Sequence, residues 1–172
     1  MGHHPATHRL HDRALAGGAL LDLGVYPVSF AHDLFGAPDR VRAVGALTPT
    51  GVDGQVSIAL GFAEVQASLH TTLHANTATT AVVFGTHGRM EIEGRFYAPT
   101  RFTVVRDDGR RWTYDGIVDA GMQYEAAEVS RCVTEGLSES PLMTWQGTLE
   151  VMRTMDEFRR QIGLVYPNEE LA

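Results

Sequence analysis

The sequence has 172 residues, 44% of them apolar and 20% charged, and its 14 basic and 21 acidic side chains give a net charge of −7. This length and composition suit one domain of ordinary size and are not those of a disordered chain. The negative charge disfavours nucleic-acid binding, for which a basic surface is needed.

Residues 1–16 contain four of the eight histidines and show no hydrophobic period. We therefore expect a flexible lead-in over 1–16, followed by one domain over 17–172. The start of the chain lacks the apolar core of a secretory signal, and no run approaches the ~20 apolar residues of a membrane span. These features predict that the protein has no membrane partner.

A dense apolar segment follows Gly17-Gly18 and stops at Gly36, which is followed by Pro38. This pattern predicts a helix over about 18–35. Pro27 lies inside the helix and cannot donate a backbone hydrogen bond, and Gly24 is a weak helix former. We therefore expect a bend or break near 24–27.

From Val41 onward the hydrophobic period changes from 3.6 to 2, which predicts a series of six or seven short strands. The alternating segments are 41–45, 56–62, 65–73, 79–84, 89–92, 102–105 and 111–114. Glycine-containing loops at 85–88 and 107–109 predict hairpins. Such tight turns indicate a mainly antiparallel sheet, because parallel neighbours need long crossovers.

Two helices are predicted at the end of the chain, over about 122–137 and 151–162, because apolar residues recur there every three or four positions. We expect both apolar stripes to pack on the sheet. The order of elements predicts an α+β fold, with an open, mainly antiparallel sheet and helices packed on one face. The only cysteine, Cys132, cannot form an internal disulfide, which favours a reducing, cytoplasmic location.

Motifs for phosphate and metal binding are missing from the sequence. It contains neither G-x-G-x-x-G nor G-x-x-x-x-G-K-[ST], so the chain itself is expected to bind no nucleotide cofactor. His70 and His74 would lie ~13 Å apart on a strand, too far for joint ligation of a metal. We interpret them as surface or interface residues and expect no metal site.

The candidate catalytic pair is Asp22 with Tyr26. Four positions apart on a helix, the two side chains share a face and could bind one substrate hydroxyl. A carboxylate among leucines needs a partner or a wet cleft. The alternative is structural: Asp22 would cap backbone near Gly17-Gly18, and Tyr26 would serve packing.

The segment Gly17-Gly-Ala-Leu-Leu-Asp-Leu-Gly-Val-Tyr26 resembles the catalytic helix of the Gfo/Idh/MocA, or glucose–fructose oxidoreductase, family. It is most similar to the dimeric dihydrodiol dehydrogenase branch, in which tyrosine ends this motif. The resemblance covers about 17–167, and further motifs match in order: Thr50-Gly-Val-Asp53, Gly85-Thr-His-Gly88, Tyr124-Glu-Ala126, Glu139-Ser-Pro141 and Tyr166-Pro167.

The resemblance implies a two-domain oxidoreductase of which this chain is the C-terminal, substrate-binding half without the Rossmann domain. NAD or NADP would belong to the full-length enzyme, and this fragment alone would be inactive and bind no cofactor. Tyr26 would exchange a proton with a sugar or diol hydroxyl, and Asp22 would orient that hydroxyl or the phenol. A phenol titrates near ~10 and needs a nearby cation to act at neutral pH. The family places a lysine for this purpose on the Rossmann domain, and all fourteen basic residues here are arginine.

Two departures from the family pattern leave the substrate open: residues 46–48 lack a basic side chain, and residues 115–121 lack an aromatic one. A sheet face without helices predicts a homodimer. The alternative function is a non-catalytic binding or assembly module that retains the scaffold.

Overall fold

The computed structural model describes residues 7–167 and residue 169. The chain divides into two units, one formed by Met1–Asn76 with Met143–Ala172 and the other by Thr77–Leu142. The predicted α+β class is confirmed, and the strands are antiparallel throughout. They form two sheets, of order β1-β2-β3 and β4-β5-β6-β7, where the sequence pattern suggested a single series of neighbours.

The first unit begins with short helical segments. Residues 1–6 of the predicted lead-in lie outside the described residues; the remainder contains 3-10 helices at Arg9–His11 and Arg13–Leu15. The leucine of the first of these, Leu10, is buried. Mobility of 1–16 remains a prediction.

The predicted helix over 18–35 consists of a π-helical segment, Leu20–Gly24, and the α-helix α1 (Val25–Phe35). The change from π to α geometry falls within the expected 24–27 region. Helix α1 ends at Gly36, whose φ of +78° suits glycine.

The stretch Arg13–Phe35 is, among the described residues, long and apolar enough to cross a membrane by length and composition. This corrects the expectation that no segment reaches that length. Leu20, Val28 and Ala31 within it are nevertheless buried in the core. A buried core helix of a globular domain passes the same test of composition.

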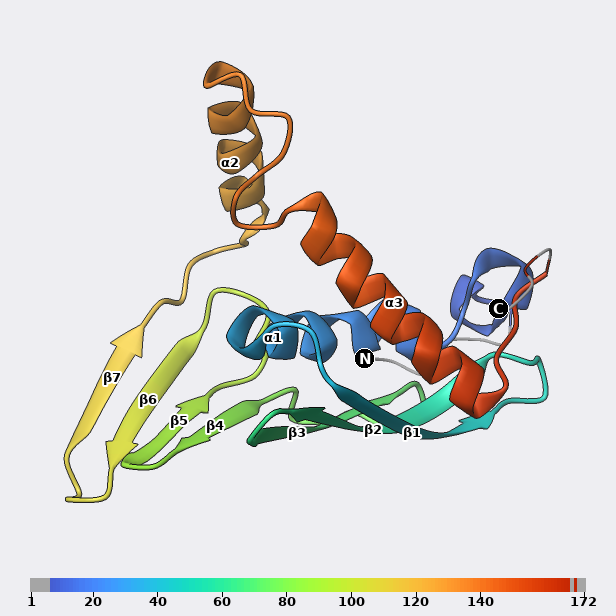
Figure 1. Cartoon of the computed structure of the whole chain (residues 1–172), viewed down its shortest axis with the longest axis horizontal. Coiled ribbons are helices and arrows are strands. Elements are labelled where there is room, and N and C mark those ends of the chain that lie inside the picture. Colours follow the sequence, from blue (N-terminus) through green and yellow to red (C-terminus); the bar gives the residue numbers. More distant parts are fainter. Residues whose placement is uncertain (1–6, 168, 170–172) are drawn as a thin grey trace. The chain divides into compact units, whose positions relative to one another are not determined.

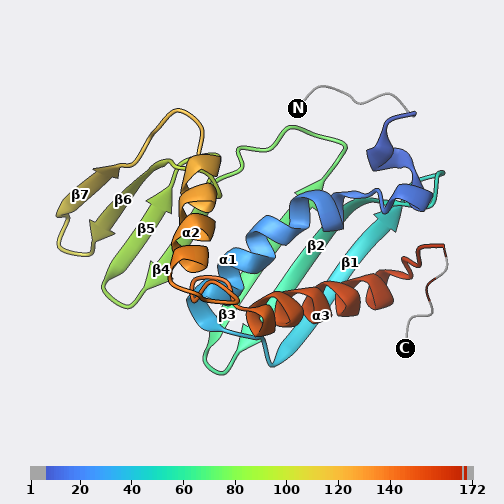
Figure 2. The same ribbon diagram turned by 90° about the horizontal axis from the view of Figure 1, so that it is seen from above.

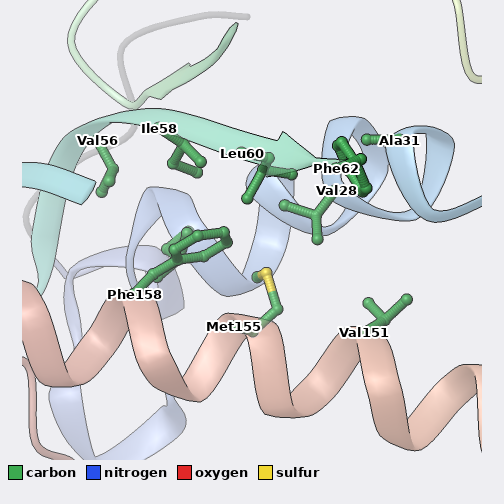
Figure 3. Packing of buried hydrophobic residues seen from close by; sticks show 10 residues of the cluster. Val28, Ala31, Val56, Ile58, Leu60, Phe62, Val151, Met155 and Phe158 are labelled. Carbon is green, nitrogen blue, oxygen red and sulfur yellow. The ribbon is translucent and has the colours of Figure 1, made fainter. Parts of the chain in front are cut away.

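The first sheet contains β1 (Arg40–Leu47), β2 (Asp53–Phe62) and β3 (Val65–Thr72), and helices α1 and α3 (Trp145–Ile162) lie on one of its faces (Figure 1, Figure 2). The alternating strand residues meet the predicted stripe of α3 in the core (Figure 3). The core residues labelled there are Val56, Ile58, Leu60 and Phe62 of β2, Val28 and Ala31 of α1, and Val151, Met155 and Phe158 of α3. The predicted packing of the last helix on a sheet is therefore confirmed.

The opposite face of this sheet carries small and polar side chains. Its registered positions include Arg42, Val44, Ala46, Ser57, Ala59, Ser68 and His70. Val44 is 78% exposed, although valine is usually a core residue. Within the described residues, α1 and α3 both lie on the other face.

The second unit contains β4 (Ala81–Gly85), β5 (Gly88–Ile92), β6 (Arg101–Arg106), β7 (Arg111–Asp115) and α2 (Met122–Thr134). Both predicted hairpins are confirmed, between β4 and β5 and between β6 and β7. Phe102 pairs with Tyr114 across β6 and β7, with ring centroids 5.2 Å apart. Aromatic pairs of this kind stabilise neighbouring strands.

Helix α2 departs from the prediction in its surroundings. Met122, Val129 and Val133, on its apolar stripe, are 75%, 63% and 73% exposed. The expectation that this stripe packs on a sheet is therefore wrong within the unit Thr77–Leu142. Helical periodicity identifies an apolar face but not the surface that covers it.

Candidate active site

The candidate site lies on the segment from Gly17 to Tyr26 in the first unit. A Cβ at Gly17 would lie 2.5 Å from the carbonyl oxygen of Arg9 and 2.7 Å from that of Leu10. The backbone at this position therefore passes too close to the preceding 3-10 turn for any side chain. Gly18 follows with a φ of +126°, in a region that L-residues rarely adopt. The two glycines direct the chain from that turn into the π-helical segment.

Asp22 lies within the π-helical segment Leu20–Gly24. Its Oδ1 accepts a hydrogen bond from Nη2 of Arg9 at 2.5 Å, and the two side chains are 23% and 58% exposed. The carboxylate thus has a cationic partner and access to solvent, in keeping with the requirement derived from the sequence. Single π-turns within helices are frequent at functional sites.

Tyr26 lies in the first turn of α1, four positions after Asp22, and is 41% exposed. The Tyr26 side chain is therefore not sealed in the core. This exposure favours the functional interpretation over the alternative in which Tyr26 serves only packing. In the structural alternative, Asp22 would cap nearby backbone. Among the described residues, the hydrogen bond that its carboxylate accepts comes instead from the side chain of Arg9.

The residue that caps the segment is Asp53, at the start of β2. It is fully buried, and its Oδ2 accepts the backbone N–H of Leu20 at 2.7 Å. Asp53 ends the motif Thr50-Gly-Val-Asp53, but its role does not follow from the sequence. Its contact with Leu20 joins residues 33 positions apart, so helical spacing could not reveal it.

Two further side chains hold the backbone of this segment. Thr71 Oγ1 donates to the carbonyl oxygen of Ala19 at 3.1 Å, and the Tyr166 hydroxyl donates to that of Gly17 at 2.7 Å. Tyr166 is buried, and the Arg159 guanidinium lies 4.7 Å from the centre of its ring. The segment that carries Asp22 and Tyr26 is therefore fixed from β2, β3 and the stretch after α3.

Burial perturbs two of these groups. It raises the pKa of the Asp53 carboxyl to about 6, while the N–H of Leu20 opposes the shift. It also raises the pKa of Tyr166 to about 12, and the negative charge of Asp53 acts in the same direction. Tyr166 therefore remains a neutral hydrogen-bond donor at physiological pH.

His70 Nδ1 lies 3.3 Å from Ser57 Oγ on the outer face of the first sheet. Across residues 7–167 and 169 there is no group of three or more His, Cys, Asp or Glu side chains placed to hold a metal ion.

Residues 1–91 match the GFO/IDH/MocA C-terminal domain. The chain therefore belongs to the Gfo/Idh/MocA oxidoreductase family, and it corresponds to the C-terminal part of these proteins. It is 33% identical over 172 residues to the human trans-1,2-dihydrobenzene-1,2-diol dehydrogenase, and 35% identical over 169 residues to that of Xenopus tropicalis. The alignments cover 94% and 92% of this chain and 51% of each relative. The chain thus spans about half the length of the curated relatives it matches.

Solved structures share the fold. The aldose-aldose oxidoreductase of Caulobacter crescentus, complexed with glycerol, superposes with a TM-score of 0.75 at 23% identity, over 92% of this chain and 49% of that one. A 3-ketoreductase of Actinomadura kijaniata in complex with NADP gives a TM-score of 0.65 at 23% identity, over 84% and 48%. These similarities establish the architecture of the chain.

Proposed function

We propose that this chain is the substrate-binding and proton-transfer half of an NAD(P)-dependent oxidoreductase that acts on the hydroxyl of a sugar or diol. The observation that carries the proposal is the exposed Tyr26 phenol one helical turn beyond the Asp22–Arg9 pair. The relatives are named for a dihydrobenzene diol and an aldose, and one structure holds glycerol. All three names indicate neighbouring hydroxyl groups.

The residues of this chain do not fit a dinucleotide. Its described strands are joined by antiparallel hairpins, and the sequence lacks the glycine-rich turn that opens a Rossmann βαβ unit. We therefore assign NAD or NADP to the half of the full-length relatives that this chain does not span. We propose for the present residues only the binding of the substrate hydroxyl and the handling of its proton.

In this scheme Tyr26 donates a proton to the substrate oxygen in one direction and accepts it in the other. Asp22 accepts a hydrogen bond from a substrate hydroxyl, while the hydrogen bond from Arg9 fixes the orientation of the carboxylate. Arg9 also supplies a cation from this chain beside Asp22, in a sequence without lysine. Proton transfer by a positioned side chain contributes about 10²–10⁴-fold to a rate.

The test compares wild type with Tyr26→Phe in the longest polypeptide that the gene encodes, assayed for nicotinamide-coupled oxidation of sugars and diols. We expect kcat to fall at least about 100-fold and KM to change little, since the ring remains and only the proton carrier is removed. Tyr124→Phe is the matched control, because this tyrosine is also exposed and lies on α2. Equal turnover in the Tyr26 and Tyr124 variants would refute the catalytic role.

A second measurement addresses the cofactor assignment. The 172-residue chain alone should not change the fluorescence of NADPH on titration. Micromolar binding by this chain would contradict the assignment of the cofactor to another domain. A wild-type full polypeptide that binds diols without turnover would favour a non-catalytic module.

We also propose that the chain forms a homodimer through the outer face of the first sheet. The exposed Val44 and the small residues Ser57, Ala59 and Ser68 allow another surface to approach this face closely. Twofold association would place the same patch of both subunits in contact. A cytoplasmic location remains a prediction from cysteine content.

A further inference from the structure

The helical segment that carries Asp22 and Tyr26 begins with a turn at Leu20. The backbone N–H of Leu20 in this turn donates a hydrogen bond to Oδ2 of Asp53 at 2.7 Å. The segment continues without interruption from Leu20 through α1 to Phe35. A displacement at Leu20 is therefore transmitted to Asp22, two positions later, and to Tyr26.

The Asp53 carboxylate lies in a buried, closely packed environment. It is fully buried, and Oδ1 has no hydrogen-bond partner among the described residues. A Cβ at Gly18 would lie 2.0 Å from this Oδ1, so the carboxylate fills the space that the missing side chain leaves. Both oxygens are thus committed to the turn at 18–20, one by hydrogen bonding and one by close packing.

Backbone N–H groups of Leu20, Asp53 and Ala19 favour the charged form of this carboxyl, but burial outweighs them, so a buried carboxylate is a costly way to hold this turn. The charge of Asp53 raises the pKa of the neutral Tyr166 hydroxyl, and the Arg159 guanidinium lies 4.7 Å from the centre of the Tyr166 ring. A negative charge at this point also faces the positive end of the helical segment, which partly offsets the cost of burial. An exposed serine or threonine would serve as a simple cap, so the buried acid calls for a functional explanation.

We propose that Asp53 is the positioning residue for the catalytic pair: it fixes the start of the helical segment, and through it the placement of Asp22 and Tyr26. The inference rests on the proposed function for its effect on turnover. Its structural part, that Asp53 sets the position of the pair, stands on the contacts alone. A misplacement of about 1 Å at reacting groups can reduce a rate about 100-fold.

The structural part is tested on the 172-residue chain by ¹H–¹⁵N spectroscopy as a function of pH. The amide of Leu20 should titrate with a midpoint near the pKa of Asp53, about 6, and the resonances of Asp22 and Tyr26 should move with it. Asp53→Asn keeps the size of the side chain and an acceptor oxygen but cannot titrate. It should abolish the Leu20 titration and shift the resonances of the pair.

The matched control is Asp39→Asn. Asp39 Oδ2 also accepts one backbone N–H, that of Ala63, at 2.7 Å, but in a different turn. This variant should leave the Leu20 titration intact. A Leu20 amide insensitive to Asp53→Asn, or Asp22 and Tyr26 resonances unmoved by it, would overturn the inference.

The catalytic part is tested in the longest polypeptide that the gene encodes. We expect Asp53→Ala to reduce kcat about 100-fold with KM within about threefold, and Asp53→Asn to recover part of the loss. If Asp53→Ala does not fold, the Asn variant against Asp39→Asn decides the question, and equal kcat in these two would refute the effect on turnover. If wild type itself has no turnover, the proposed function fails, while the spectroscopic result still decides whether Asp53 positions the pair.

Discussion

The carboxylate of Asp53 occupies the space in which a side chain at Gly18 would lie, with only 2.0 Å between its Oδ1 and an ideal Cβ there. The backbone of Gly18 has a φ of +126° as well. Two independent constraints therefore favour glycine at this position, which immediately precedes the helical segment of the candidate site.

Gly18→Ala should accordingly destabilise the chain by about 2–4 kcal/mol, because it combines backbone strain with a clash against a buried side chain. Gly163→Ala is the control: its φ of +71° is also positive, in the left-handed helical region, but no atom lies within 4 Å of the added Cβ. That variant should cost only about 1 kcal/mol. Urea unfolding of both variants measures the difference, and equal losses would show that Asp53 yields to the added methyl group.

The pH dependence of stability should reflect Asp53. Its pKa is about 6 in the folded chain and ~3.9 when unfolded, so the folded state binds the proton more tightly. The stability due to this group is complete below pH ~3.9 and is lost as pH rises through about 6. Asparagine cannot titrate, so the Asp53→Asn variant does not lose stability in this way as the pH rises. The unfolding free energy of the variant minus that of wild type should thus increase between pH ~4 and ~7, by up to about 3 kcal/mol. A flat difference would contradict the raised pKa.

Arg9→Gln separates activity from stability. The pair with Asp22 is partly exposed, so its loss should change the unfolding free energy by less than about 1 kcal/mol. In the full polypeptide we expect kcat/KM to fall about tenfold, since a charge-assisted hydrogen bond that orients Asp22 is lost. Arg101→Gln, which removes an exposed pair with Asp115 at 2.8 Å, is the control and should leave kcat/KM unchanged. Equal kcat/KM for both variants would exclude a role for Arg9.

The two long helices should respond differently to truncation of their apolar residues. Phe158→Ala in α3 removes a fully buried ring and should cost about 3–5 kcal/mol. Val133→Ala in α2 removes two methyl groups from a side chain that is 73% exposed and should change stability by less than about 0.5 kcal/mol. A loss of several kcal/mol for Val133→Ala would mean that the stripe of α2 is covered in solution.

Val44→Asp addresses the proposed dimer. Sedimentation should give a dimer for wild type and a monomer for the variant, because a charge replaces an exposed valine on the outer sheet face, in the edge strand β1. Val82→Asp, at a 46% exposed valine in β4, is the control and should remain dimeric. A monomeric wild type at high concentration would refute the dimer.

Much of the fold follows from local patterns. The alternation of β2 and the stripe Val151, Met155 and Phe158 identify the residues that form the core, because each period records which side of an element is buried. The division into two sheets was not predicted. Hairpin signals identify neighbouring strands, but nothing in the segment between Thr72 and Ala81 indicates that the pairing stops there.

The candidate site, too, can be predicted only in part from local patterns in the sequence. Asp22 and Tyr26 are visible in the sequence because a helix places residues four apart on one face. Arg9 and Asp53 lie 13 and 33 positions from their partners, so no local period connects them to the site. Only the tertiary structure reveals which charged side chains surround the pair.

The first unit is discontinuous, since α3 and Tyr166 follow the whole of Thr77–Leu142 in the chain. During synthesis on the ribosome, Met155 and Phe158 cannot fill the core, and Tyr166 cannot reach Gly17, 149 positions earlier, until the inserted unit has been translated. Contacts of such high sequence separation form slowly, because a long loop must close first. Throughout this interval the nascent β1–β3 sheet therefore exposes the part of its apolar face that α3 later covers, which favours aggregation of the newly made chain.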